Sequence, residues 1–168
     1  MRKMNQGYHE IKEHGKREFP FNIYPCSIPV DFTHVALHWH EEMEIIAVKK
    51  GNGQITVDTV SYPVSEGDIL AVFPGQLHAI SCGSGERMEY ENIIFRISML
   101  MGDNGDGCTV HFLSPLQEGQ AKKPVLIQKG QTDYEVFGNV IRELDKFSQQ
   151  QGNGYQLAVK GQLFLFLY

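Results

Sequence analysis

The feature that most restricts the fold of this chain is a close succession of short strand-like segments between residues 19 and 98. They are rich in Ile, Val, Phe, Tyr and Thr, and turns such as Lys50-Gly51-Asn52-Gly53 and Phe73-Pro74-Gly75 separate them. The expected strands are Phe19–Tyr24, His34–His40, Met43–Lys49, Gly53–Val57, Ser61–Val64, Asp68–Phe73, His78–Cys82 and Met88–Ser98. Seven or eight short strands at this spacing predict a mainly β domain, a sandwich or barrel in which hairpins close the sheet edges.

The two ends of the chain differ in pattern from this strand-rich middle. Residues 1–18 are polar and charged, which predicts a loosely held arm. Beyond Gly130 apolar residues recur at three- and four-residue spacing, which is the period of an α-helix. We therefore expect an N-terminal arm over residues 1–18, a β-barrel over 19–130 and a helical segment over 131–168.

Within the helical segment the pattern predicts two α-helices. Apolar side chains over residues 136–147 form the stripe of an amphipathic helix, and Thr132 and Glu135 precede it at the spacing of a capping box. A second helix is expected over residues 155–168, and its last six residues are all apolar. A soluble protein rarely leaves such a run exposed, so it either packs on a partner or the chain continues beyond residue 168 in its parent protein.

Composition narrows the classes of function. With 15 basic and 20 acidic side chains the formal net charge is −5, and the lysine and arginine residues form no stripe that could grip a DNA backbone. The N-terminus has no apolar core of a signal peptide, and no segment is apolar over the roughly 18–20 residues of a membrane span. Three widely spaced cysteines without a CxxC motif indicate a reducing, cytoplasmic location. The stretch Gly102–Gly107 lacks the further ligands of a calcium loop, and we expect a surface loop there.

The residues that carry chemistry begin with His38 and His40, which point the same way because side chains alternate faces along a strand. Glu44 follows a short turn and belongs to the neighbouring strand, where its carboxylate can approach both imidazoles. His78 comes after an apolar strand and a Pro-Gly turn, at the start of the returning strand. Three imidazoles and a carboxylate inside a barrel would suit one divalent transition metal (Zn, Ni, Mn or Fe) with open positions for a ligand or water.

These residues match two motifs of the cupin family. The first, H-x-H-x3-E-x6-G, is matched by His38, His40, Glu44 and Gly51. The second, G-x5-P-x-G-x2-H-x3-N, is matched by Gly67, Gly75 and His78. The chain departs from the second motif at Phe73 and Cys82, where proline and asparagine would stand, and Phe32 replaces the glycine that usually precedes the first motif.

The wider sequence resembles the N-terminal cupin domain of AraC-type transcription regulators over residues 17–168. The resemblance rests on the runs HWHEEMEIIAVKKGNGQITV and EGDILAVFPGQLHAI, the later FLSPLQEG, a short apolar strand near 125–127 and the two expected helices. It implies a cupin-type double-stranded antiparallel β-helix, that is, a jelly-roll barrel, followed by two C-terminal α-helices. In that family two helix-turn-helix units follow, and they are not in this sequence.

The resemblance also implies a function, ligand sensing and dimerisation. A small-molecule effector, for example a sugar, would bind in the barrel at His38, His40, Glu44 and His78, and the same four residues would hold the metal if one is bound. No residue would be catalytic. The helix over 136–147 would form a homodimer, DNA would be bound only through a domain outside this chain, and no membrane would be involved.

Two alternatives remain open. A cupin metalloenzyme, such as a dioxygenase or a sugar isomerase, would use the same three histidines and glutamate, although the altered second motif and the helical tail favour the sensor. The four side chains could also merely satisfy one another inside the barrel.

We expect the other polar and aromatic residues around the cluster to have structural or surface roles. Trp39 should pack on the opposite face, Glu41 and Glu42 should lie in a solvated turn, and Cys82 should fill apolar space. Arg96 alternates with Glu89 and Glu91 along one strand, so the three cannot face the interior together, and surface charge is their expected role.

Overall fold

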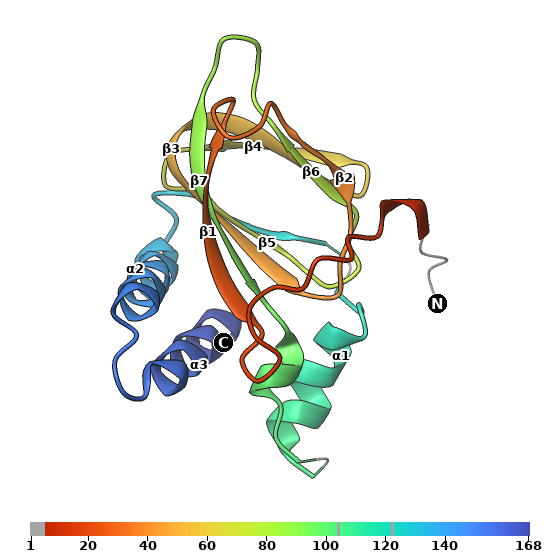
Figure 1. Cartoon of the computed structure of the whole chain (residues 1–168), viewed down its shortest axis with the longest axis vertical. Helices are drawn as coiled ribbons and strands as arrows, with labels where there is room; N and C mark the ends of the chain where they lie inside the picture. The colour runs from red at the N-terminus through yellow and green to blue at the C-terminus, as the bar shows by residue number, and fades with distance from the viewer. Residues whose placement is uncertain (1–5, 104, 122) are drawn as a thin grey trace. The chain divides into compact units, whose positions relative to one another are not determined.

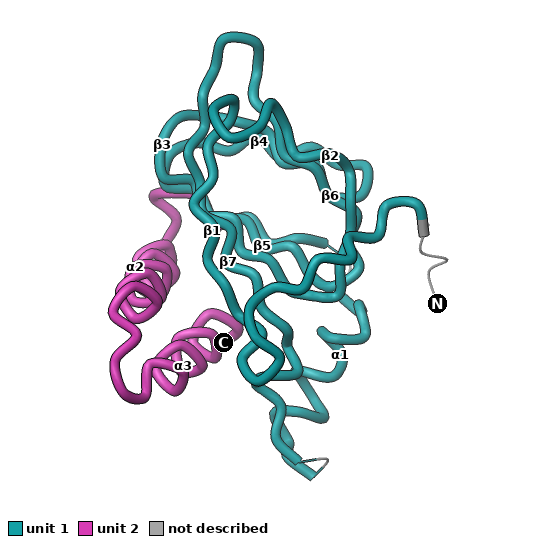
Figure 2. Tube along the Cα trace, in the orientation of Figure 1, with its two compact units in different colours: residues 1–126 teal, residues 127–168 magenta. Residues whose placement is uncertain are grey.

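The computed structural model describes residues 6–103, 105–121 and 123–168 and divides into two compact units, residues 1–126 and 127–168 (Figure 2). The described residues include one sheet system of eight strands (Figure 1). Its strands are β1 (Phe21–Ile28), β2 (Val35–His38), β3 (Met43–Val57), β4 (Val60–Ser65), β5 (Ile69–Val72), β6 (His78–Ser81), β7 (Met88–Phe95) and β8 (Val125–Ile127). The predicted mainly β architecture is confirmed.

The barrel closes around β3, the longest strand. Residues 43–51 of β3 pair antiparallel with β7, and residues 44–47 also pair with β5. Residues 52–57 pair with β4, and residues 54–57 also pair with β6. β7 pairs in turn with β1, and β6 pairs with β2, all antiparallel. Because one strand belongs to both groups of pairings, the sheet folds back over itself as a jelly-roll barrel requires.

The sequence pattern predicts two strands, Met43–Lys49 and Gly53–Val57, where the structure has one. The glycine-containing segment between them is a bulge and not a reversal of the chain. The register with β7 shifts between Val48 and Lys50, and Gly51 has a φ of +79°. A bulge bends a strand and increases its twist without ending it, so β3 passes from one layer to the other.

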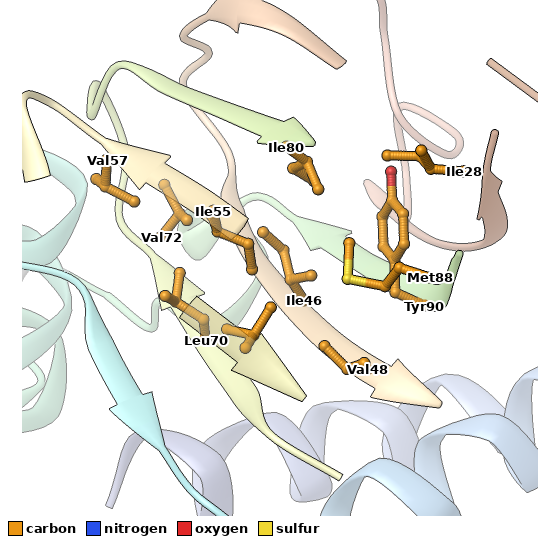
Figure 3. Close-up of a cluster of buried hydrophobic side chains, with 11 residues drawn as sticks. Ile28, Ile46, Val48, Ile55, Val57, Leu70, Val72, Ile80, Met88 and Tyr90 are labelled. Atoms are coloured by element: carbon orange, nitrogen blue, oxygen red, sulfur yellow. The ribbon is translucent and has the colours of Figure 1, made fainter. Parts of the chain in front are cut away.

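The interior of the barrel is apolar along most of β3 and β5. Ile46, Val48, Leu70 and Val72 alternate along these strands and are each at most 3% exposed. They belong to a buried cluster that also contains Ile28, Ile55, Val57, Val64, Ile80, Met88 and Tyr90 (Figure 3). Glu44 precedes Ile46 by two strand positions and therefore points to the same interior face.

The segment after β7 is helical, and the strand is shorter than the sequence predicts. The strand ends at Phe95, short of the expected Ser98, and a 3-10 helix, η2 (Ile97–Leu100), follows. A π-helical stretch, η3 (Thr109–Leu113), continues into α1 (Ser114–Gln117), and neither was expected.

An aspartate of the Gly102–Gly107 stretch serves as a helix cap. The Asp106 carboxylate accepts hydrogen bonds from the backbone N–H and the hydroxyl of Thr109, each at 2.7 Å, just before η3. Asn104, the asparagine of the same stretch, lies outside the described residues. The capping role accounts for this aspartate without a calcium ion.

The unit of residues 127–168 contains the two expected helices, α2 (Tyr134–Gln150) and α3 (Tyr155–Leu167). They pack together with the rings of Phe137 and Phe166 edge to face, 5.4 Å between centroids. The predicted capping box is wrong, because α2 begins at Tyr134 and its cap position, Asp133, makes no side-chain capping bond. No helix within the described ranges has both the length and the apolar character needed to cross a membrane.

Gly51→Ala should lower the stability of the barrel by more than the strain of an alanine at positive φ. A Cβ at residue 51 would lie 1.9 Å from the carbonyl oxygen of Arg87, so β3 and β7 would have to separate locally. Gly85→Ala is the matched control, because Gly85 has a φ of +81° with nothing within 4 Å of the added Cβ. In urea unfolding we expect a loss of about 1 kcal/mol for Gly85→Ala and about 3 kcal/mol for Gly51→Ala. Equal losses would contradict this account of the bulge.

Candidate functional site

The four predicted site residues meet inside the barrel. His38 ends β2 and His78 begins β6, and the pairing of these strands places the two residues opposite each other. His40 follows β2 by two residues, and Glu44 is the second residue of β3. One donor atom from each of the four side chains lies within 4.8 Å of all the others. The convergence predicted from strand alternation is therefore present in the fold.

The Glu44 carboxylate is at the centre of this histidine–glutamate cluster. Its Oε2 lies 3.0 Å from Nε2 of His40 and 3.1 Å from Nε2 of His78. These three residues are at most 2% exposed, whereas the side chain of His38 is 20% exposed. The ring of His38 lies 4.2 Å from that of His78, centroid to centroid. His38 thus forms the more open side of the cluster.

Backbone carbonyls orient all three imidazoles. Nδ1 donates to the carbonyl of Ala36 in His38 (2.8 Å), of Glu42 in His40 (3.1 Å) and of Gln76 in His78 (2.9 Å). Each ring must carry its proton on Nδ1, because a carbonyl oxygen only accepts hydrogen bonds. In a neutral ring Nε2 then carries the lone pair that can bind a metal ion. Hydrogen bonds of this kind fix the tautomer and orientation of metal-binding histidines.

The chemistry of the donor set fits a divalent metal ion. Nε2 of His40 and Nε2 of His78 both approach one carboxylate oxygen of Glu44, which without a metal requires a second proton on each ring for a hydrogen bond. Two buried imidazolium ions would then share one carboxylate. A divalent ion would replace both protons with one ion of the same total charge, which all four side chains could contact. Imidazole with carboxylate is a common transition-metal ligand set.

The electrostatic shifts agree with this arrangement. Burial opposes ionisation of Glu44, but the charge on His78 and the hydrogen bonds from His40 and His78 outweigh it and hold the pKa of Glu44 well below its usual range. Burial opposes protonation of His78 as well, but the Glu44 carboxylate raises its pKa. Burial and the neighbouring His78 lower the pKa of His38. The cluster therefore has an anionic centre and a neutral imidazole on its open side.

The Pro-Gly corner between β5 and β6 explains the departure from the cupin motif at Phe73. The backbone N–H of Phe73 donates to Oε1 of Gln76 at 2.8 Å, a bond that proline could not make. The N–H of Gly75 donates to the carbonyl of His40 at 2.9 Å. The corner thus bonds to His40 through Gly75 and to His78 through the carbonyl of Gln76. Cys82 packs against the apolar cluster, as expected.

The prediction that Glu42 lies in a solvated turn is wrong, whereas Glu41 is exposed as expected. Glu42 is 3% exposed and accepts a hydrogen bond from Nε of Arg96 at 2.8 Å. Its backbone carbonyl accepts the hydrogen bond from Nδ1 of His40, so this ion pair helps to hold His40 in position. The partner of Glu42 is 54 positions away in sequence, and no local pattern indicates it.

The described part of the N-terminal arm, which the sequence predicts to be loosely held, makes specific contacts beside the cluster. The N–H of Trp39 donates to the carbonyl of Tyr8, and the N–H of Glu10 donates to the carbonyl of Trp39, both at 2.9 Å. The rings of His9 and Trp39 stack with centroids 4.1 Å apart. Trp39 packs as expected, at 7% exposed, but it does so against the arm. The one sequence signal for this was the number of histidines and glutamates in an otherwise featureless segment.

The arm also brings ionisable side chains to the open side of the cluster. Glu10 Oε2 lies 3.7 Å from Nε2 of His38 and 3.7 Å from Nε2 of His14. His14 is 5% exposed, and its Nδ1 lies 3.1 Å from the hydroxyl of Tyr24 on β1. Glu10 and His14 are therefore site residues that the sequence pattern does not identify.

Comparison with known families gives one match that spans most of the chain. Residues 29–167 match the family described as the AraC-like ligand binding domain. An uncharacterized HTH-type transcriptional regulator, YdeC of Bacillus subtilis strain 168, is 28% identical over 88 residues, which are 52% of this chain and 30% of that protein. The chain thus spans about a third of the length of this relative.

Solved structures of cupin proteins align with about half of the chain. A cupin 2 conserved barrel domain protein from Salinispora arenicola is 22% identical, with a TM-score of 0.43, over 49% of this chain and 68% of its own. A predicted oxalate decarboxylase from Thermotoga maritima is 24% identical, with a TM-score of 0.41, over 44% of this chain and 64% of its own.

Arg96→Ala should cost stability because it leaves the Glu42 carboxylate, whose side chain is 4% exposed, without its counter-ion. We expect a loss of about 2 kcal/mol in urea unfolding, less than for a fully buried pair because the Arg96 side chain is 47% exposed. Arg87→Ala is the control. It breaks the pair with Glu89, whose side chains are 59% and 38% exposed, and should cost less than about 1 kcal/mol. Similar losses in both variants would mean that Glu42 needs no counter-ion.

Proposed function

Since this chain belongs to the family of AraC-like ligand-binding domains, we propose that it senses a small-molecule effector for an AraC-type transcription regulator. The observation that supports the proposal most strongly is the histidine–glutamate cluster in a barrel whose interior is apolar along most of β3 and β5. Ionisable side chains are rarely buried together unless they pair or bind a ligand. A small polar molecule, for example a sugar, would bind at His38, His40, Glu44 and His78. In this function no residue is catalytic.

One divalent transition metal, Zn²⁺, Ni²⁺, Mn²⁺ or Fe²⁺, is part of the proposal. His38, His40, Glu44 and His78 would hold it, with their backbone-bonded rings orienting Nε2 toward the ion. When bound, the ion would supply a Lewis acid that attracts an oxygen of the effector. The residues themselves would exclude bulk water and set the direction from which that oxygen approaches.

Transmission of the signal would use the helical unit. Apolar side chains remain exposed on α2 and α3, at Val136 (55%), Leu157 (76%), Phe164 (42%) and Leu165 (52%), and we assign them to a homodimer contact. DNA would be bound through a domain outside these residues. An effector with different affinities for two arrangements of the domain would then bias DNA binding. Such a regulator acts in the cytoplasm, where the free cysteines Cys26, Cys82 and Cys108 stay reduced.

The rival function is a cupin metalloenzyme, a dioxygenase or a sugar isomerase. The observation that favours it is the same set of three imidazoles and one carboxylate, because this set leaves open positions on a metal. Turnover of a substrate by the metal-loaded protein, lost in His40→Ala, would support the enzyme over the sensor.

The sensing function predicts that a ligand of the cluster stabilises the folded protein. Thermal unfolding would be followed with each of the four metal ions and with a panel of monosaccharides, singly and together. At a ligand concentration 100-fold above Kd, the stabilisation should reach about 2.7 kcal/mol. His40→Ala should abolish it, whereas His34→Ala, which changes an exposed histidine outside the cluster, should leave it intact. Stabilisation that persists in His40→Ala would place binding elsewhere.

Dimerisation through the helical unit predicts a specific effect of Leu165→Glu. The substitution puts a charge on a residue that is 52% exposed on α3, and sedimentation should show at least a tenfold weaker dimer. Val60→Glu changes a residue that is 51% exposed on β4 and should leave the dimer unchanged. A wild-type protein that sediments as a monomer at every accessible concentration would contradict the dimer.

A further inference from the structure

We propose that Tyr90 and Asn92, two polar residues on the interior face of β7, form a subsite that recognises uncharged hydroxyl groups of the effector. This inference rests on the proposed sensing function and deepens it. The histidine–glutamate cluster would bind one end of the molecule, and this β7 pair would bind hydroxyl groups at the other end. The effector class is then a small polyhydroxylated molecule, such as a neutral monosaccharide.

Pairing across the sheet places the β7 pair inside the barrel. Asn92 lies opposite Ile46 of β3, and Tyr90 lies opposite Val48. Residues that face each other across an antiparallel pairing have their side chains on the same side of the sheet. Both partners on β3 belong to the buried interior cluster (Figure 3), so the β7 pair points into the same interior.

The separation between the β7 pair and the histidine–glutamate cluster suits a small molecule. Glu44 lies opposite Ile94 of β7, and Asn92 is two residues away from Ile94 along the strand. Two residues of an extended strand span roughly 7 Å. Asn92 faces inward and is only partly buried, so the interior is accessible at this level. A molecule that contacts the cluster through one oxygen therefore places its other groups beside Asn92.

Each residue of the β7 pair carries a buried oxygen without a partner. Oδ1 of Asn92 and the hydroxyl of Tyr90 are closed to solvent and have no hydrogen-bond partner among the described residues. Tyr90 as a whole is 1% exposed. A buried polar group without a partner lowers stability, and an apolar side chain of the same shape would remove that cost. Two such groups on one face of one strand indicate that a bound molecule completes their hydrogen bonds.

The neighbour of Tyr90 on β1 is a poor substitute for such a molecule. Cys26 lies opposite Tyr90, and its thiol donates to the carbonyl of Tyr24 at 3.5 Å. Sulfur is only a weak acceptor, so the hydroxyl of Tyr90 remains available to donate to a ligand. Burial raises the pKa of Tyr90, and the nearby Cys26 and Glu44 raise it further, so the hydroxyl keeps its proton.

The surroundings determine the kind of group that the β7 pair accepts. The residues opposite the pair on β3, Ile46 and Val48, are apolar and at most 3% exposed. A charged group there would lose its hydration without gaining a counter-ion, which is costly. Uncharged hydroxyl groups avoid this cost, because they can donate to Oδ1 of Asn92 and accept from the hydroxyl of Tyr90. The β7 pair therefore selects hydroxyl groups over carboxylate or ammonium groups.

The test measures binding to the whole chain and to variants that remove the two oxygens. Tyr90→Phe removes only the hydroxyl, and Asn92→Leu replaces the amide with an apolar side chain of similar size. Tyr134→Phe and Asn153→Leu are the controls, because they make the same changes in the unit of residues 127–168.

The probes are D-glucose, D-galactose, D-mannose and D-xylose, each compared with its monodeoxy derivatives and with a sugar acid derived from it. The Kd of each probe would be obtained from thermal unfolding at increasing probe concentration, in parallel without added metal and with Zn²⁺. The melting temperature of each variant without a probe would be recorded in the same series.

At least one neutral monosaccharide should bind wild type, and one of its deoxy derivatives and its sugar acid should bind at least tenfold more weakly. Tyr90→Phe and Asn92→Leu should each weaken the monosaccharide about tenfold, the size expected for one hydrogen bond, and should discriminate less against the deoxy derivative. The controls should bind like wild type. Without a probe, the melting temperatures of both β7 variants should be unchanged or higher, because each substitution removes an unpaired buried oxygen.

Equal affinities in wild type and in both β7 variants would overturn the subsite and leave the sensing function, which the His40→Ala comparison tests, in place. Lower melting temperatures of both β7 variants without a probe would assign the pair a structural role and would also overturn it. Absence of monosaccharide binding to wild type would overturn the proposed effector class. Stabilisation by a metal ion alone, lost in His40→Ala, would in that case still show that the cluster binds a ligand.

Discussion

The organisation of the site depends on one carboxylate that accepts hydrogen bonds from two imidazoles brought by different parts of the sheet. Glu44 lies on β3, His78 begins β6, and the two are 34 positions apart in sequence. Only the passage of β3 between the two groups of pairings brings them together, because the first half of the strand carries Glu44 and the second half pairs with β6. Closure of the barrel therefore creates the cluster, and the bulge between Val48 and Lys50 lies where β3 passes from one group of pairings to the other.

The cluster opposes the stability of the barrel around it. Ile46, Leu70 and Val72 are fully buried, and Glu44 and His78 occupy comparable interior positions. Burying charged groups is unfavourable unless partners compensate, and here each imidazole has a backbone carbonyl at Nδ1 while the carboxylate has two imidazoles. A sequence under selection for stability alone would place apolar side chains there. Local departure from the rules of core packing, with hydrogen-bond partners for the buried groups, is expected at a binding site and supports the site proposed for the cluster.

Much of the fold and the centre of the site could be predicted from the sequence, because both follow from short-range patterns. Alternation along a strand put His38 and His40 on one face, and the Pro-Gly turn returned His78 to the same interior. The errors lie where long-range contacts decide. A glycine turn and a glycine bulge have the same local composition, so the unity of β3 depends on β7 across the sheet. Glu42 is buried because Arg96 reaches it from far along the chain, and the charged arm is bound because its backbone forms hydrogen bonds with the N–H and the carbonyl of Trp39.

The contacts between the arm and Trp39 set the free energy that would be needed to move residues 8–10. Two backbone hydrogen bonds and one stacked pair hold residues 8–10 to Trp39, and each such contact contributes only about 1 kcal/mol. A ligand shifts an equilibrium by no more than its difference in affinity for the two states, typically 1–3 kcal/mol. An element docked by so few contacts is therefore within the range that occupancy of the cluster can control. The size of these free energies supports the proposed sensor, in which occupancy of the cluster would shift the domain between two arrangements.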